Sequence, residues 1–171
     1  MNILSASLVL AFVFSSTIYG KDAKMEPISN FDLNQYLGKW YEIARLPASF
    51  EKNLINVTAT YSMRNDGKVK VENQGIDQKS NKNKIAIGKA KFAGNSNIGY
   101  LKVSFFGPFY ADYKIIELDT NYQFALVMSS TKYAWILSRS PKLDSVIVNK
   151  LLEKAKMAGI NTLDFYFTPQ N

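Results

Sequence analysis

The feature that most constrains the fold is a series of eight short runs in which apolar and polar side chains alternate. The runs cover residues 40–45, 56–63, 68–72, 84–92, 100–106, 110–118, 122–128 and 133–138. Such alternation is typical of β-strands with one buried face, and no helical pattern lies between the runs. The sequence therefore predicts an all-β protein, either a sandwich or an up-and-down barrel.

A closed barrel is the better solution for eight strands of this kind. An open sheet would leave two edges of unpaired N–H and C=O groups, whereas a barrel removes both. A barrel of about eight strands also encloses room for one small ligand, unless its own side chains fill it. One face of the run at 84–92 carries Ala86, Gly88 and Ala90, which leave space. We therefore expect an eight-stranded antiparallel up-and-down barrel with an internal cavity.

Helical patterns occur only at the two ends of this series. Residues 30–37 indicate a helical turn capped by Asn30 or Asp32. After the last run, Asp144 is followed by a longer helical pattern that Gly159 ends. The apolar face of this helix is expected to consist of Val146, Ile147, Leu151, Leu152 and Ala155. Residues 163–167 predict a short ninth strand.

The first 20 residues have the character of a secretory signal. They carry no charge, the run 3–14 is almost wholly apolar, and Gly20 precedes the first lysine. The apolar run is shorter than the roughly 20 residues that a membrane-spanning helix needs, which argues against an uncleaved anchor. We expect residues 1–20 to be a signal peptide, 21–29 a polar leader and 30–171 the barrel domain, since 171 residues fit one domain.

Two residue types are absent, and their absence limits the chemistry. Without cysteine there are no disulfides, thiolate nucleophiles or cysteine-bound metals. Without histidine the chain lacks the usual general base near neutral pH and the commonest metal ligand. These absences argue against an enzyme, and we expect no metal and no cofactor.

Four blocks of sequence, in order, resemble the lipocalin family, in particular the branch of the bacterial lipocalins and apolipoprotein D. The blocks are GKWYEIAR at 38–45, VTATYS at 57–62, LKVSFFGPFY at 101–110 and WILSRSP at 135–141. The resemblance implies the barrel with one C-terminal helix. It also implies carriage or storage of a fatty acid, a lysophospholipid or a similar amphiphile, in membrane maintenance or stress. By the same resemblance, Trp40 and Arg139 pack together across the closed end as a structural pair. We expect Gly38 to allow a positive φ or a close backbone approach there.

With Trp40 facing inward, strict alternation places a mainly apolar and aromatic set inside the barrel. The expected ligand-binding residues are Glu42, Val57, Ala59, Tyr61, Val71, Asn73, Ala90, Phe92, Leu101, Val103, Phe105, Tyr113, Tyr133, Trp135 and Leu137. Such a set is the usual lining of a small-molecule pocket, although each member alone is equally well explained as core. Glu42 shares its face with Trp40 and Ala44. It either orients a ligand head group or pairs internally with an arginine or tyrosine.

The mouth of the barrel is expected to carry exposed aromatic side chains. Residues 46–54 should cross it with Phe50, and residues 105–110 should form another part of the rim with Phe106 and Phe109. These rings either help a ligand pass between membrane and pocket or form a homodimer contact. The basic stretch at 79–91 is either a solvated face or a contact with anionic lipid. Nucleic acid is a poor partner, because no binding motif is present.

Two alternatives stay open alongside the carrier. One is an enzyme that acts on a lipophilic substrate in the cup, for which Glu42 and scattered tyrosines are the only inner polar groups. The other is a module that binds a protein partner through the aromatic rim. Many bacterial lipocalins are attached to the outer membrane by a lipidated cysteine, which this sequence does not contain. We therefore expect an exported, soluble periplasmic or extracellular protein, with outer-membrane association as an alternative.

Overall fold

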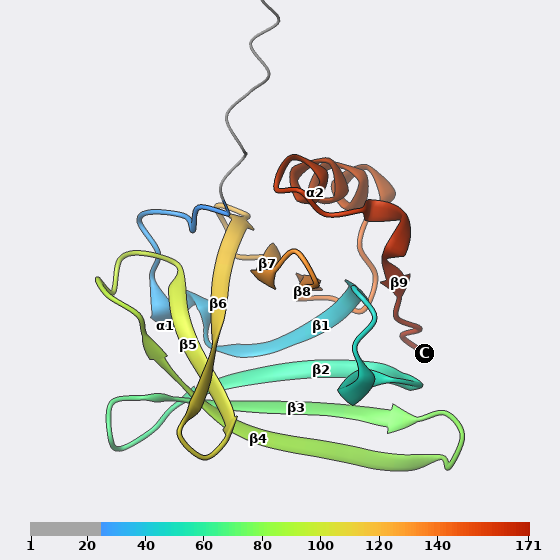
Figure 1. Ribbon diagram of the computed structural model, residues 1–171, viewed down its shortest axis with the longest axis horizontal. Helices are drawn as coiled ribbons and strands as arrows, with labels where there is room; N and C mark the ends of the chain where they lie inside the picture. The colour runs from blue at the N-terminus through green and yellow to red at the C-terminus, as the bar shows by residue number, and fades with distance from the viewer. Residues whose placement is uncertain (1–24) are drawn as a thin grey trace, which may run out of the picture.

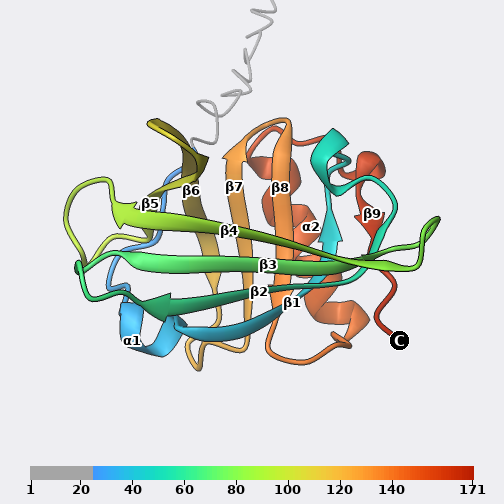
Figure 2. The same ribbon diagram turned by 90° about the horizontal axis from the view of Figure 1, so that it is seen from below.

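The computed structural model describes residues 25–171, so the predicted signal lies outside the described residues. Nine antiparallel strands form one sheet in the order β2-β3-β4-β5-β6-β7-β8-β1-β9, and β1 pairs with β2 as well. This additional pairing closes the first eight strands into a barrel, with α2 packed on its outside (Figures 1 and 2). The predicted barrel, C-terminal helix and short ninth strand are therefore confirmed.

The strands follow the alternating runs closely. In chain order the elements are α1 (Leu33–Tyr36), β1 (Gly38–Arg45), η1 (Ser49–Glu51), β2 (Leu54–Met63), β3 (Val69–Asp77), β4 (Lys82–Phe92), β5 (Tyr100–Phe106), β6 (Phe109–Leu118), β7 (Phe124–Ser130), β8 (Tyr133–Ser138), α2 (Ser145–Met157), η2 (Thr162–Asp164) and β9 (Tyr166–Phe167). The strands β5 and β8 have the predicted bounds, and β3 extends beyond the predicted run to Asp77. The ninth strand is shorter than predicted, because Asn161 caps the 3-10 turn η2 where residue 163 was expected to be extended.

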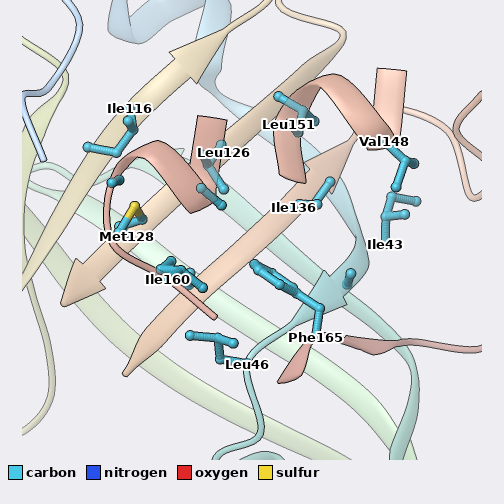
Figure 3. Close-up of a cluster of buried hydrophobic side chains, with 14 residues drawn as sticks. Ile43, Leu46, Ile116, Leu126, Met128, Ile136, Val148, Leu151, Ile160 and Phe165 are labelled. Carbon is cyan, nitrogen blue, oxygen red and sulfur yellow. The ribbon is translucent and has the colours of Figure 1, made fainter. Parts of the chain in front are cut away.

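The barrel wall separates two apolar cores. On β7 and β8, Val127 and Leu137 belong to the core inside the barrel, whereas Leu126 and Ile136 belong to the core beneath α2. Figure 3 shows this outer core, in which Leu151 of α2 packs with the outward side chains of the strands. Both faces of these two strands are therefore buried, and only the inner face is available to a ligand.

The caps of α2 agree with the sequence, but its buried face does not. The Asp144 side chain accepts a hydrogen bond from the Val146 amide at 2.7 Å, and Gly159 has a φ of +87°. The predicted place of Val146 on the buried face is wrong, since its side chain is exposed and Val148 is buried instead. In the first turn the helix presents Val148 to the barrel, in line with Leu151 one turn later. At α1, Asp32 and not Asn30 is the cap, because its carboxylate accepts from the Asn34 amide at 2.9 Å.

A bulge in β1 changes which side chains face inward. Glu42 lies opposite Leu137, but Ala44 lies opposite Ile136, so β1 contains one extra residue between the two pairs. Beyond the bulge, Ala44 joins the outer core and Arg45 lies opposite Trp135 on the inner face. The expectation that Ala44 shares the face of Trp40 and Glu42 is therefore wrong, because a bulge reverses the alternation.

Among residues 25–171, no helix has the length and apolar character required to span a membrane.

Truncation of Leu151 tests the outer core. The side chain is fully buried, so Leu151→Ala is expected to lower the free energy of unfolding by about 2–5 kcal/mol in urea denaturation. Leu163→Ala is the matched control, because Leu163 is 92% exposed and its truncation should have little effect. Equal losses of unfolding free energy in both variants would contradict the packing of α2 on this core.

Candidate functional site

The closed end of the barrel is sealed by Trp40 and Arg139, as the resemblance implies. Trp40 is fully buried, and the Arg139 guanidinium carbon lies 3.9 Å from the centroid of its ring. The guanidinium also donates to four backbone carbonyls, those of Gln35, Leu37, Lys39 and Tyr122. Stacking combined with four hydrogen bonds makes this arginine a structural plug.

Gly38 makes room for that plug. Its φ of +95° lies in the left-handed region, as expected from the sequence. A Cβ atom at this position would lie 3.4 Å from Nη1 of Arg139, so a side chain would also crowd the guanidinium. Both features favour glycine at the start of β1.

Three tyrosines inside the barrel form a chain of hydroxyl groups. The Tyr113 hydroxyl lies 2.7 Å from that of Tyr36 and 2.7 Å from that of Tyr61. Burial raises the pKa of Tyr61 to about 12 and the pKa values of Tyr36 and Tyr113 well above 10. The phenols therefore stay neutral. The three hydroxyl groups carry three protons, and two of these protons form the two hydrogen bonds between the tyrosines. One hydroxyl group is therefore left to donate to another acceptor.

Most of the side chains predicted to face inward belong to the core inside the barrel. Of the predicted set, Tyr61, Val71, Ala90, Leu101 and Leu137 are buried in this core, and Ala59, Phe92, Val103, Phe105, Tyr113 and Trp135 are partly buried against it. The partly buried members keep some access to solvent although they point inward.

The other predicted residues differ from one another in their surroundings. Val57 is buried at an irregular point of β2, and a Cβ atom on Gly75 would lie 3.1 Å from it. Tyr133 lies at the rim, where its exposed ring is 6.0 Å from that of Phe50. Asn73 lies opposite Ala59 on the inner face, and its buried Oδ1 has no hydrogen-bond partner. An unpaired buried acceptor is costly, so it marks a place for a donor from a ligand or a water molecule.

A buried polar cluster joins β1 to the mouth and to the C-terminal segment. Arg45 forms a buried ion pair with Glu42, and the Thr168 hydroxyl donates to the same Glu42 carboxylate at 2.5 Å. Arg45 also donates to the Glu51 carbonyl oxygen at 2.7 Å and to that of Leu54 at 3.2 Å. Of the two roles considered for Glu42, the structure therefore shows internal pairing with an arginine.

Glu51 links this cluster to the inner face of β8. Its carboxylate accepts a hydrogen bond from the Trp135 indole N–H at 3.1 Å and lies 4.0 Å from Nε of Arg45. Burial, with the nearby Glu42 charge as a second cause, raises the pKa of Glu51 to about 7. One guanidinium thus faces two carboxyl groups, so a proton on Glu51 relieves the excess negative charge near neutral pH.

The sequence did not identify Arg45, Glu51 or Thr168 as parts of the site. Arg45 was missed because alternation without a bulge puts it on the outer face. Glu51 lies in a loop and Thr168 after the last strand, where no periodic pattern applies. Glu42 and Arg45 are three positions apart, a spacing that puts them on opposite faces of a regular strand, so the sequence contains no signal for this pair.

The expected rim is confirmed. Phe50, in the turn η1, is exposed, and so are Phe106 and Phe109 at the turn between β5 and β6. In the part of the chain that the structure describes, no group of three or more Asp and Glu side chains is arranged to hold a metal ion.

Comparison with known proteins identifies the family of this barrel. Residues 31–170 match the lipocalin-like domain family, which covers nearly all of the described chain. The protein is a lipocalin.

Two relatives support the branch that the sequence blocks indicate. The outer membrane lipoprotein Blc of Vibrio cholerae is 46% identical over 165 residues, covering 95% of this chain and 96% of the relative. Mouse apolipoprotein D is 35% identical over 141 residues, covering 77% of this lipocalin and 73% of the relative. Among solved structures, insecticyanin from the tobacco hornworm has a TM-score of 0.69 at 22% identity, over 84% of this chain and 82% of its own. The last comparison shows the fold alone.

Membership of the family establishes a protein class that binds small hydrophobic ligands. It does not identify the ligand of this lipocalin, and the contacts of the inward-facing set with a ligand stay a prediction.

Removal of the plug should destabilise the lipocalin barrel. Arg139→Ala leaves four carbonyls and the Trp40 ring without their partner, so we expect a loss of about 2–4 kcal/mol in unfolding free energy by urea denaturation. Arg64→Ala is the control, because Arg64 pairs only with Asp66 at the surface and should contribute less than about 1 kcal/mol. Indistinguishable variants would show that the plug is not structural.

Glu51 should make stability depend on pH. A pKa raised from 4.5 to about 7 means that the folded protein binds this proton more tightly than the unfolded chain. The resulting stabilisation is complete below the unfolded value and is lost as the pH rises through about 7. Between about pH 5 and about pH 8, the wild type should therefore lose about 1–3 kcal/mol relative to Glu51→Gln.

Urea denaturation across this pH range measures the difference. Glutamine keeps an acceptor for the Trp135 indole and removes the titration. Glu153→Gln, on the exposed side of α2, is the control and should follow the wild type at each pH. If Glu51→Gln also follows the wild type, the proposed protonation is wrong.

Proposed function

We propose that this lipocalin carries or stores a long-chain amphiphile, such as a fatty acid or a lysophospholipid, with its hydrocarbon tail in the barrel and without chemical change. The supporting observation is the set of inward-facing apolar and aromatic side chains that keep access to solvent, Ala59, Val103, Phe105 and Trp135 among them. They lie above an end that is sealed by Trp40 and Arg139. A hydrocarbon tail is the ligand that such a lining favours.

The energetics are adequate for this role. Each CH₂ group removed from water contributes about 0.8 kcal/mol, from which the cost of ordering the chain is subtracted. Micromolar binding or tighter is therefore expected for a long alkyl chain. Near the tail, the unpaired Oδ1 of Asn73 supports a ligand that offers a hydroxyl donor, such as the glycerol hydroxyl of a lysophospholipid.

The polar groups inside the barrel support binding without catalysis. Glu42 and Arg45 are engaged with each other and with Thr168, and the three tyrosine phenols remain protonated. Glu51, whose pKa is raised to about 7, is likewise engaged by the Trp135 indole and lies beside Arg45. We also propose that the protein is exported and works in membrane maintenance or stress, in association with the outer membrane. The name of the Vibrio cholerae relative supports this location.

Two neighbouring positions on opposite faces of β2 test the proposal. Ala59 faces inward, opposite Trp40 and Asn73, whereas Thr60 faces outward, opposite Lys39 and Glu72. Ala59→Phe fills the space assigned to the tail, so we expect oleate and oleoyl lysophosphatidylcholine to bind at least about tenfold more weakly by calorimetry. Thr60→Phe adds the same ring outside the barrel and should leave the affinity unchanged.

The ligands recovered after incubation are identified by mass spectrometry. Unchanged ligand supports carriage, and turnover would replace the carrier by an enzyme. Wild-type protein that binds neither amphiphile would contradict the proposal, as would equal binding by wild type and Ala59→Phe.

A further inference from the structure

One surface of the barrel has a marked bias in charge that the proposed carriage of a ligand does not explain. From residue 78 to residue 111 the sequence contains six lysines and no aspartate or glutamate, although the full sequence of 171 residues contains 14 acidic residues. This segment includes β4, β5 and the turn that follows β5.

The outer face of β4 is half apolar and half basic. Asn73 and Val71 lie opposite Ala86 and Gly88 on the inner face, so residues 85, 87, 89 and 91 form a single outward row. In this row Ile85 and Ile87 are 60% and 59% exposed, and Lys89 and Lys91 follow them. The strand β4 pairs with β5 only from Lys89 to Phe92. The part of β4 that carries the two isoleucines therefore has β3 as its only neighbouring strand among the described residues.

The turn between β5 and β6 adds two larger apolar side chains. Phe106 and Phe109 flank Gly107 and Pro108, and they are 83% and 80% exposed. A groove of about 220 Å³, lined by Ile87, Lys89 and Gly107 among others, lies between this turn and β4. Figure 1 shows the turn, in yellow, next to the green ribbon of β4. Ile87 is therefore a neighbour of the turn that carries the two phenylalanines.

The lysines beside them are available for an external anion. Within the described chain, Lys89 and Lys91 form no ion pair. The Lys91 ammonium lies 4.8 Å and that of Lys89 6.0 Å from the centroid of the Tyr110 ring on the same outer face. These contacts hold the ammonium groups along the surface without neutralising them.

We propose that this docking face, defined by Ile85, Ile87, Phe106, Phe109, Lys89 and Lys91, binds the surface of a bilayer that contains anionic phospholipid. Phe106 and Phe109 enter the boundary between head groups and acyl chains, and the lysines contact the lipid phosphates. The turn that carries the phenylalanines belongs to the open end of the barrel, so docking brings the mouth to the membrane. This orientation rests on the proposed function, because it places the cup beside a source of amphiphiles.

The chemistry of the face favours a bilayer over other partners. A second copy of the chain would oppose its own lysines, and like charges across an interface are costly. An acidic protein would satisfy the lysines but would have to cover two phenylalanines on a turn, whereas a bilayer solvates both kinds of side chain at once. Each lysine near an anionic surface is expected to increase binding roughly fivefold.

Vesicle flotation tests the docking face with the exported chain. With vesicles of equal parts phosphatidylcholine and phosphatidylglycerol at about 0.1 M salt, we expect the wild type to float with the lipid. Binding should be lost on vesicles of phosphatidylcholine alone and weakened strongly at about 1 M salt, where charges are screened. The double variants Phe106→Ser with Phe109→Ser, and Lys89→Gln with Lys91→Gln, should each bind at least about tenfold more weakly.

Matched variants on the α2 side separate this face from a general effect of charge or apolarity. Met157→Ser with Leu163→Ser removes two exposed apolar side chains, and Lys142→Gln with Lys156→Gln removes two exposed charges. Both should bind vesicles like the wild type. Equal losses of vesicle binding in the docking-face variants and in the α2-side variants would overturn the proposal. Wild-type protein that binds soluble polyglutamate but not the vesicles would also overturn it.

Calorimetry with monomeric oleate distinguishes this proposal from the proposed function. The docking variants should retain the wild-type affinity for oleate in solution, because none of the four substituted side chains belongs to the core inside the barrel. Oleate binding by a wild type that does not float would overturn the docking face and leave the carrier intact. Flotation by a protein that does not bind oleate would support the docking face and contradict the carrier.

Discussion

The closure of the sheet through β1 is the constraint on which the rest of the molecule depends. Residues 38–41 of this strand pair with β2, its second half pairs with β8, and its last two residues pair with β9. The pairing removes both sheet edges and gives the barrel an inside. The same eight residues supply Trp40 to the plug, Glu42 and Arg45 to the buried polar cluster, and Ala44 to the core beneath α2. A bulge is what allows one short strand to serve both faces.

The interior changes in character from the closed end to the mouth. A stacked arginine and tryptophan seal the bottom beside three neutral tyrosine hydroxyls, and the Glu51 carboxyl group connects Trp135 to a turn that crosses the opening. Hydrocarbon favours the apolar surfaces between these groups. Most of the inner polar groups form hydrogen bonds with one another, which suits a binding protein better than an enzyme.

Much of the fold was predictable because the alternation of side chains is a local property. The bounds of β5 and β8 follow directly from it, and the Asp144 cap follows from the chemistry of helix ends. The inward direction of Tyr61, Val103 and Trp135 is confirmed for the same reason. The plug is different, since its two residues are 99 positions apart in sequence and only the family resemblance paired Trp40 with Arg139.

The parts that were not predicted depend on contacts between distant segments. The bulge in β1 is fixed by its pairing with β8, and it reverses the faces of Ala44 and Arg45. The partner of Glu42 at Thr168 comes from beyond the last strand, and no periodicity reports it. Likewise, Val146 and Val148 have equal apolar character, and the packing of α2 on the barrel decides which of them is buried.

The proposed carriage requires a hydrocarbon tail inside the barrel beside Trp135. Quenching of tryptophan fluorescence by oleate analogues brominated along the chain tests it most directly, because bromine quenches only at contact distance. The chain has two tryptophans, and Trp40 is buried beneath Arg139. The proposed site predicts saturable quenching in the wild type and much weaker quenching in Trp135→Phe, with oleate affinity retained. Equal quenching in both proteins, or oleate binding without quenching, would place the hydrocarbon tail elsewhere and contradict the proposed site.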